Sequence, residues 1–262
     1  MNKFIKYIPK NIYLSKLCQI YLNYYQNENN SDMHTNGELW FLDKILPECD
    51  VVFDVGANIG DWSNSVISIN SSCSVYSFEP SLTTFNKLSS NIISDKAILN
   101  NIGLGSVVEK NTLYINESRD TLNSMYCREG LNLPDSIDKS STEIVNIERL
   151  DEYCHNHNIT SIDLLKMDVE GFELEVLLGS GEFISQNKIN IIQFEYGGAN
   201  IDAKVLLKDL MSLLILNGYK VYKIHSNYLE YIESYSQNLE NFQYKNFIAV
   251  NKKYHLNKML FK

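Results

Sequence analysis

The chain has 262 residues, 44% of them hydrophobic, and a formal net charge of −9 at pH 7. This length and composition can bury one large core. The acidic balance argues against binding to a phosphate backbone, so no nucleic-acid partner is expected. The five cysteines are scattered without a Cys-x-x-Cys pair, which is typical of reduced thiols in a cytoplasmic protein and not of a disulfide or zinc site.

Residues 1–46 are predicted to form a helical extension ahead of a domain of residues 47–262. Lysines and apolar residues interleave near the N-terminus, and no apolar run is long enough for a signal peptide or a membrane span. This pattern allows a short amphipathic helix. We expect it to pack on its own domain or on a sister subunit, which would support a homo-oligomer. Contact with a membrane surface is the alternative.

The most informative stretch comprises residues 51–62. Residues 51–55 are β-branched and apolar except for Asp54, as expected of a strand that is covered on both faces. Gly56 and Gly60 bracket a tight turn, after which residue types that suit a helix start follow. A strand, a glycine turn and a helix N-terminus in this order are typical of a nucleotide-binding loop.

The loop does not match the dinucleotide fingerprint Gly-x-Gly-x-x-Gly, because Asn58 and Asp61 stand where its second and third glycines would be. This mismatch disfavours an NAD-linked dehydrogenase. A carboxylate at the strand end suits a cationic nucleoside without phosphate, and S-adenosylmethionine carries both an ammonium and a sulfonium group. We therefore expect this cofactor to be bound by Asp54, Gly56, Asn58 and Gly60.

Further strands and helices alternate along the chain. Strands are predicted at residues 74–80, 97–102 and 189–194, and residues 162–171 are predicted to form a buried strand with charges at its carboxyl end. Residues 220–225 and 247–252 are expected to complete the sheet as an antiparallel pair. Extra strands are expected at residues 107–116 and 143–147. The polar loop of residues 117–142, which includes Arg119, Asn123, Ser124, Arg128 and Asp135, could hold an acceptor or be a solvated hairpin. This alternation predicts a doubly wound α/β sheet.

Carboxylates stand at the carboxyl ends of several predicted strands. Glu79 follows Gly60 at the spacing at which an acidic residue accepts hydrogen bonds from ribose hydroxyls. Asn101 and Ile102 end the third strand, where they would lie at the edge of the adenine. Because ligands of such sheets bind outside these strand ends, we expect one site for a cation or a polyol. Its further members would be Asp168, Glu170 and Glu195.

With these motifs the chain resembles the FkbM family of S-adenosylmethionine-dependent methyltransferases over about residues 50–254. The resemblance rests on residues 53–60, 78–80, 101–105 and 165–173, and the Lys-x-Asp-x-Glu-Gly-x-Glu pattern of the last block is the most specific. It implies a seven-stranded Rossmann-like sheet with an antiparallel last strand. It also implies methyl transfer to hydroxyl groups of sugars or polyketides.

In-line methyl transfer to a hydroxyl is helped by a base that accepts the hydroxyl proton. Asp168 is the first candidate for this base. Glu170 and Glu195 could orient the acceptor or share the role, and Lys166 could hold Asp168 or stabilise an alkoxide. A divalent cation could bind these carboxylates through oxygen ligands, but none is expected.

The function predicted from the sequence is O-methylation of a sugar or glycan in polysaccharide or glycoconjugate biosynthesis. Two alternatives stay open: O-methylation of a non-sugar secondary metabolite, and a non-catalytic cofactor-binding partner in a glycan-assembly complex. A nucleic-acid methyltransferase is disfavoured by the acidic charge. It is also disfavoured because residues 168–171 stand where an amino-methylating enzyme would have Asn/Asp-Pro-Pro-aromatic.

Overall fold

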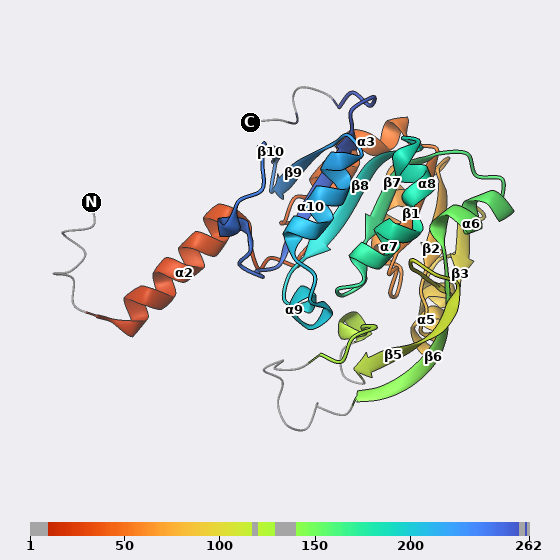
Figure 1. The fold of residues 1–262 in the computed structure, drawn as a ribbon. Helices are drawn as coiled ribbons and strands as arrows, with labels where there is room; N and C mark the ends of the chain where they lie inside the picture. The colour runs from red at the N-terminus through yellow and green to blue at the C-terminus, as the bar shows by residue number, and fades with distance from the viewer. Residues whose placement is uncertain (1–9, 117–119, 129–139, 257–259, 261–262) are drawn as a thin grey trace.

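The computed structural model describes residues 10–116, 120–128, 140–256 and 260. Within them, eight strands form a larger sheet and three form a smaller one (Figure 1). The larger sheet consists, in order, of β10 (Tyr228–Ile232), β9 (Tyr219–His225), β11 (Lys245–Asn251), β8 (Ile189–Tyr196), β7 (Ile162–Met167), β1 (Val51–Val55), β2 (Ser74–Phe78) and β3 (Ala97–Asn100). The smaller sheet consists of β4 (Gly103–Leu104), β6 (Ser140–Glu148) and β5 (Glu109–Asn116).

The predicted mixture of parallel and antiparallel strands is confirmed. Strands β8, β7, β1, β2 and β3 pair in parallel, whereas β11 runs antiparallel to both of its neighbours, β8 and β9. The fold is thus the doubly wound, mostly parallel sheet with an antiparallel last strand that the sequence predicts. Strand β10 extends this arrangement as an eighth strand, in a segment where only a loop was expected, because it forms a hairpin with β9.

Helices cover both faces of the larger sheet. One face carries α6 (Leu150–Asn156), α7 (Glu173–Gly179), α8 (Gly181–Ser185) and α10 (Leu207–Leu216), and the other carries α3 (Glu38–Ile45) and α4 (Asp61–Ile69). Helix α5 (Leu82–Asn91) packs beside α4. Successive residues of β1 enter opposite cores, since Val52 packs with α3 and α4 whereas Phe53 packs with α6. Each large aliphatic side chain buried in this way contributes about 1.5–3 kcal/mol to stability.

The helix that ends at Leu216 begins later than the sequence predicts, and a short separate helix precedes it. A single amphipathic helix is expected at residues 204–216, but the structure forms α9 (Ala199–Ala203) and begins α10 only at Leu207. Lys204 ends α9 with a left-handed backbone, φ 57°. A residue with this conformation cannot continue a right-handed helix, so the chain turns before α10 begins.

The two N-terminal helices differ in their packing. Helix α3 buries Phe41, Leu42 and Ile45 against the sheet. Helix α2 (Ile12–Gln26) extends away from the body (Figure 1), and none of its residues is buried. The N-terminal amphipathic segment was expected to pack on its own domain or on a sister subunit, and α2 does not pack on its own domain. No helix in the described part of the chain has the length and hydropathy needed to cross a bilayer.

Candidate active site

A pocket lies where β1, β2 and β7 end. Its lining includes five of the residues predicted for the site, namely Gly56, Asn58, Glu79, Asp168 and Glu170. Apolar side chains from both sheets and from two connecting loops also line it, among them Phe78, Leu104, Leu113, Met125 and Phe172. The pocket is thus polar along the strand ends and apolar elsewhere, which suits a small ligand that combines charged groups with a ring.

The turn after β1 forms one wall of the pocket. Gly56 has φ +80°, and its backbone N–H donates to the carbonyl oxygen of Phe78 (3.0 Å). A Cβ atom on Gly56 would lie 1.9 Å from the carbonyl oxygen of Asp168, so only glycine permits β1 and β7 to end this close together. Asn58 is also left-handed, with φ 47°, and its Oδ1 accepts a hydrogen bond from the backbone N–H of Ile59 (2.8 Å).

Glu79 is bonded to this turn from the neighbouring strand end. Its Oε2 accepts from the backbone N–H of Asn58 (3.0 Å), and its Oε1 accepts from the backbone N–H of Ser81 (3.0 Å). Each oxygen keeps a further lone pair, so the carboxylate can still accept hydrogen bonds from a ligand. Burial raises the pKa of Glu79 to about 7, against an ordinary value of 4.5.

Asp54 lies behind the pocket and is fully buried. Its Oδ2 accepts from Ser63 Oγ (2.7 Å), and its Oδ1 accepts from Lys166 Nζ (3.1 Å). The strand register explains this pair, because Asp54 and Lys166 stand opposite one another in β1 and β7. Asp54, which was expected to meet a cationic ligand, therefore forms an ion pair with a lysine of the protein itself. Its carboxylate does not line the pocket.

Lys166 links this buried pair to the pocket. Its Nζ lies 3.5 Å from Asp168 Oδ2 and 5.4 Å from the centre of the Trp62 ring. Burial alone would lower the pKa of Lys166, but the carboxylates of Asp54, Asp168 and Glu38 outweigh it and raise the pKa above its ordinary value. Lys166 thus stays charged and holds the carboxylate of Asp168 in position.

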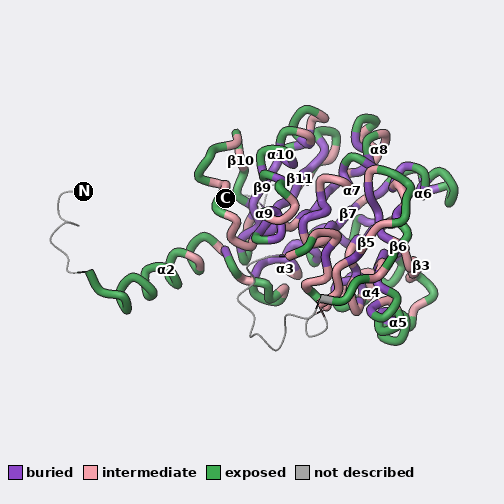
Figure 2. Tube along the Cα trace, turned by 60° about the horizontal axis from the view of Figure 1, so that its bottom comes forward, coloured by how far each residue is buried: buried purple, intermediate pink, exposed green. Residues whose placement is uncertain are grey.

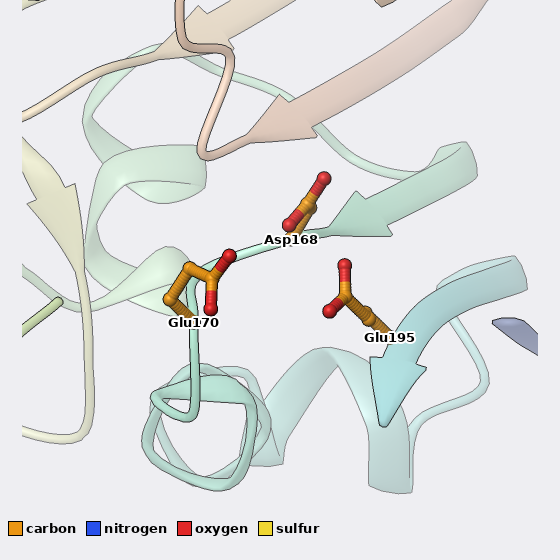
Figure 3. A group of neighbouring side chains, drawn as sticks. All are labelled: Asp168, Glu170 and Glu195. Atoms are coloured by element: carbon orange, nitrogen blue, oxygen red, sulfur yellow. The ribbon is translucent and has the colours of Figure 1, made fainter. Parts of the chain in front are cut away.

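Asp168, Glu170 and Glu195 converge on one point (Figure 3). One carboxylate oxygen from each lies within 4.8 Å of the others. Burial and the carboxylate of Asp168 raise the pKa of Glu170 to about 7, although Arg128 opposes the shift. Burial, Asp168 and Glu170 also raise the pKa of Glu195 well above its ordinary value. The group can therefore hold a proton near neutral pH, bind the hydroxyls of a polyol or provide oxygen ligands for a divalent cation.

Besides Asp54, three further predicted cofactor contacts lie apart from the pocket lining. Asn101 donates from Nδ2 to the carbonyl oxygens of Glu79 (2.9 Å) and Pro80 (3.0 Å), so it stabilises the strand end that carries Glu79. Ile102 packs against the core. At Gly60, with φ +94°, an added Cβ would meet side chains of α5. The ligand roles predicted for these residues remain predictions.

Arg128 comes from the polar loop for which an acceptor-binding role and a solvated hairpin were both left open. Its NH1 pairs with Glu170 Oε2 (2.5 Å), and its Nε pairs with Asp202 Oδ2 (3.2 Å). Ser124 Oγ from the same loop donates to the carbonyl oxygen of Glu170 (2.7 Å). These contacts hold the loop against the acidic group, and Asn123 lines the pocket. Arg119 and Asp135 lie outside the described residues.

Glu38 is a buried member of this region that the sequence analysis missed. It belongs to α3, and its carboxylate accepts hydrogen bonds from the side-chain amides of Asn36 (2.6 Å), Gln193 (2.7 Å) and Asn246 (3.1 Å). Burial raises its pKa, against the opposing charge of Lys166. No local signal in the sequence could have found Glu38, because two of its three partners come from β8 and β11, more than 150 residues away.

Glu173 supports the turn that follows β7. Its Oε1 accepts from the backbone N–H groups of Val169 (3.2 Å) and Gly171 (3.3 Å). Burial raises its pKa to about 7, against an ordinary value of 4.5. The folded protein therefore binds this proton more tightly than the unfolded chain does. The contribution to stability is complete below about pH 4.5 and is lost as the pH rises through about 7.

We accordingly expect the free energy of unfolding to be larger at pH 5.5 than at pH 8.5. Glu173→Gln should reduce this difference by about 2 kcal/mol, since about 1.5 pH units lie between pH 5.5 and the raised pKa of about 7, and each unit corresponds to about 1.4 kcal/mol. Urea denaturation of both proteins at the two pH values measures the effect. Glu48→Gln removes a carboxylate at an exposed position and is the control. An unchanged pH dependence in Glu173→Gln would rule out this carboxyl as its source.

The strand order and the pocket at the carboxyl ends define a class I methyltransferase-like α/β fold. The family model described as "Methyltransferase FkbM domain" matches residues 54–221, which is more than half of the chain. The chain therefore belongs to the FkbM family of methyltransferases. This membership confirms the resemblance inferred from the sequence motifs.

Several solved structures are similar to the chain in fold. Methyltransferase FkbM from Methylobacillus flagellatus is 16% identical, with a TM-score of 0.47, and the match covers 77% of this chain and 43% of that one. The present chain thus spans less than half the length of that protein. The plantazolicin methyltransferase BpumL, solved in complex with SAH, is 9% identical, with a TM-score of 0.44, over 90% of this chain and 91% of that one.

The Methanococcus jannaschii fibrillarin pre-rRNA processing protein is 12% identical, with a TM-score of 0.44, over 79% of this chain and 69% of that one. Among curated proteins, none matches the chain.

Proposed function

We propose that the protein is an S-adenosylmethionine-dependent O-methyltransferase that acts on a hydroxyl group of a sugar or glycan. The observation that carries this proposal is the arrangement of one pocket, in which the glycine turn and Glu79 lie beside the carboxylates of Asp168 and Glu170. Membership of the FkbM family supports methyl transfer. We further propose that residues 47–262 form the methyltransferase domain and residues 1–46 a helical extension.

The residues present fit S-adenosylmethionine. Glu79 offers two oxygens with free lone pairs to the ribose hydroxyls, and the turn at Gly56 lets the backbone approach a ligand closely. Phe172 and Leu104 supply an apolar surface that suits an adenine ring. The bound cofactor supplies an electrophilic methyl group and a neutral thioether leaving group. What remains for the protein is to align the acceptor and to remove its proton.

Asp168 is the proposed base. It follows β7 and lines the pocket, with 39% of its side chain accessible against 17% for Glu170, and its Oδ2 lies 3.5 Å from Lys166 Nζ. Glu170 and Glu195 would accept hydrogen bonds from other hydroxyl groups of the acceptor. This acidic group favours a neutral, polyhydroxylated acceptor over an anionic one, because a second negative charge would be repelled. The expectation that the reaction needs no divalent cation stays a prediction.

Calorimetric titration of the full chain with S-adenosylhomocysteine tests the cofactor. We expect micromolar binding, no binding of NAD, and at least about a tenfold loss of affinity in Glu79→Ala, since a hydrogen bond to a charged group contributes about 1.5–3 kcal/mol. Glu143→Ala is the matched control. Glu143 also accepts a backbone hydrogen bond, from Leu82 at the start of α5 (2.9 Å), but it does not line the pocket.

A folded protein that fails to bind S-adenosylhomocysteine would overturn the proposed function. Binding that is equally strong in Glu79→Ala would keep the cofactor but remove the ribose contact. A protein that binds the cofactor and transfers methyl groups only to non-sugar hydroxyls would support the alternative of a secondary-metabolite methyltransferase. Binding without any transfer would support a non-catalytic partner.

A further inference from the structure

Helix α2 is the largest feature that the proposed function leaves unused. None of its 15 residues is buried, and Figure 2 shows the helix leaving the body as an exposed segment. Nearly half of the large hydrophobic side chains that are exposed in the described residues lie in this one helix. They are Ile12, Tyr13, Leu14, Leu17, Ile20, Tyr21, Leu22, Tyr24 and Tyr25, with exposed fractions of 45% to 84%.

The side chains of α2 are sorted by face. Its polar residues form a single stripe with helical spacing, made up of Ser15, Lys16, Gln19, Asn23 and Gln26. At 3.6 residues per turn this stripe occupies about a third of the circumference, and Ile12 is the one apolar residue within it. The remaining two-thirds of the circumference is apolar. An apolar face of this width exceeds the stripe of ~100° that a helix needs to cover one surface of its own protein.

The charge of the N-terminal region is opposite to that of the rest of the chain. Residues 1–26 contain four lysines, Lys3, Lys6, Lys10 and Lys16, and no acidic residue. Because the whole chain has a net charge of −9, the remaining residues carry −13. An anionic lipid surface would attract the lysines, at about 1 kcal/mol each near the surface, and repel the acidic body. Pairing of α2 with the α2 of a second copy would instead bring like charges together.

The tyrosines of α2 fit the same surface. Four of its residues are tyrosines, and Tyr21 and Tyr25 stack with their ring centres 6.3 Å apart. Tyrosine combines an apolar ring with a polar hydroxyl, and it is enriched at the boundary between lipid and water. The long lysine stems can reach the headgroups while the apolar face enters the acyl region.

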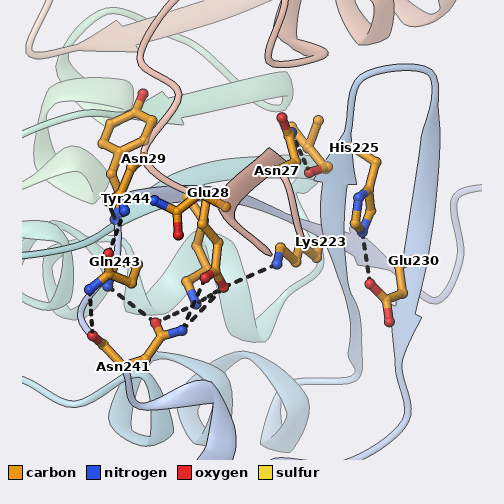
Figure 4. Close-up of polar contacts among 12 residues, drawn as sticks. Asn27, Glu28, Asn29, Lys223, His225, Glu230, Asn241, Gln243 and Tyr244 are labelled. Atoms are coloured by element: carbon orange, nitrogen blue, oxygen red, sulfur yellow. Dashed lines mark hydrogen bonds and ion pairs between the residues drawn. The ribbon is translucent and has the colours of Figure 1, made fainter. Parts of the chain in front are cut away.

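The root of α2 is fixed to the sheet (Figure 4). Asn27 ends the helix in a left-handed conformation, and its Nδ2 donates to the carbonyl oxygens of Asn36 (2.6 Å) and Ile224 (3.1 Å). The buried carboxylate of Glu28 accepts from Lys245 Nζ (2.8 Å) and Lys223 Nζ (3.3 Å). These contacts tie the base of α2 to β9 and β11, so whatever the helix binds is held at a set place relative to the body.

We propose that α2 lies in the headgroup region of an anionic phospholipid bilayer and holds the acidic body at the membrane surface. Its apolar face would be buried in lipid, with Lys10 and Lys16 at the phosphate groups. The helix lies on the surface, because its 15 residues are too short to span a bilayer. The inference is independent of the proposed function, since no residue of α2 lines the pocket.

Co-sedimentation of the full chain with phospholipid vesicles tests this inference. We expect binding to phosphatidylcholine vesicles that contain phosphatidylglycerol and much weaker binding to phosphatidylcholine alone. Raising the ionic strength from about 0.1 M to about 1 M should weaken the binding, because the Debye length falls from ~10 Å to ~3 Å. The double variant Leu17→Gln/Tyr21→Gln should bind the vesicles at least about tenfold more weakly, since two apolar side chains no longer enter the lipid.

The matched control is Ser15→Gln/Asn23→Gln, which makes two neutral changes on the polar stripe of the same helix and should bind like the unchanged protein. Light scattering without vesicles measures the oligomeric state. A folded protein that does not bind to anionic vesicles would overturn the inference. So would a stable dimer that dissociates in Leu17→Gln/Tyr21→Gln, because a second copy of the chain would then cover α2.

Discussion

Asp168→Asn is expected to lower the rate of methyl transfer by about 10²–10⁴-fold, the usual contribution of a positioned general base. Asparagine keeps the size of the side chain and one oxygen, but it cannot accept the hydroxyl proton. Transfer of tritiated methyl groups from S-adenosylmethionine to a panel of neutral sugars, with cofactor and acceptor saturating, measures the effect. Circular dichroism and S-adenosylhomocysteine titration would show that the variant is folded and still binds cofactor.

Asp120→Asn is the matched control for this experiment. Asp120 lines the same pocket, but it pairs with Lys87 (2.8 Å) and is not one of the three converging carboxylates. Its replacement should change the rate by less than about tenfold, as expected of a group outside the proton transfer. If Asp168→Asn kept most of its activity while Glu195→Gln lost it, the base would be Glu195 and Asp168 would serve to position the acceptor.

The largest effect on stability is expected for Gly56→Ala. The added Cβ would lie 1.9 Å from the carbonyl oxygen of Asp168, and the backbone there has φ +80°, which alanine adopts only with strain. Because the obstacle is backbone and not a flexible side chain, β1 and β7 would have to separate. We expect a loss of about 3 kcal/mol or more in the free energy of unfolding, together with weaker S-adenosylhomocysteine binding.

Gly198→Ala is the matched control, because it makes the same chemical change at a position where it should not lower the free energy of unfolding. Gly198 has φ −60° and ψ −27°, and a Cβ atom there would meet nothing within 4 Å. We expect this variant to match or slightly exceed the unchanged protein in stability, by up to about 1 kcal/mol, because alanine reduces the entropy of the unfolded chain. Urea denaturation of both variants gives the comparison, and a Gly56→Ala protein as stable as Gly198→Ala would refute the steric argument.

The proposed acidic site also constrains the acceptor. Glu170 and Glu195 lie beside Asp168, and burial together with mutual repulsion raises the pKa of both. Release of protons from Glu170 and Glu195 as the pH rises would increase the negative charge beside Asp168, which disfavours an anionic acceptor further. Arg128 limits the repulsion by pairing with Glu170, so the loop that carries Arg128 belongs to the site even though its sequence carries no motif.

The sequence by itself determined the parts of this protein that depend on local patterns. The β-branched run of residues 51–55 and the two glycines after it specify a buried strand and a turn that only glycine can make. The spacing from Gly60 to Glu79 specifies a carboxylate at the next strand end, and Glu79 does bond to the turn, at Asn58. The strand and turn predictions succeeded because strand period and turn conformation are encoded within a few residues, whereas the ribose contact of Glu79 stays a prediction.

Only the tertiary structure decided which charged groups meet. Asp54 was expected to face a ligand, but the register of β1 and β7 sets it against Lys166, and that pairing is absent from any local pattern. Glu38 reaches the same region from α3 through partners far along the chain. The exposure of α2 was likewise decided at this level. An amphipathic pattern specifies that an apolar face must be covered, but what covers it depends on the surfaces that folding leaves nearby.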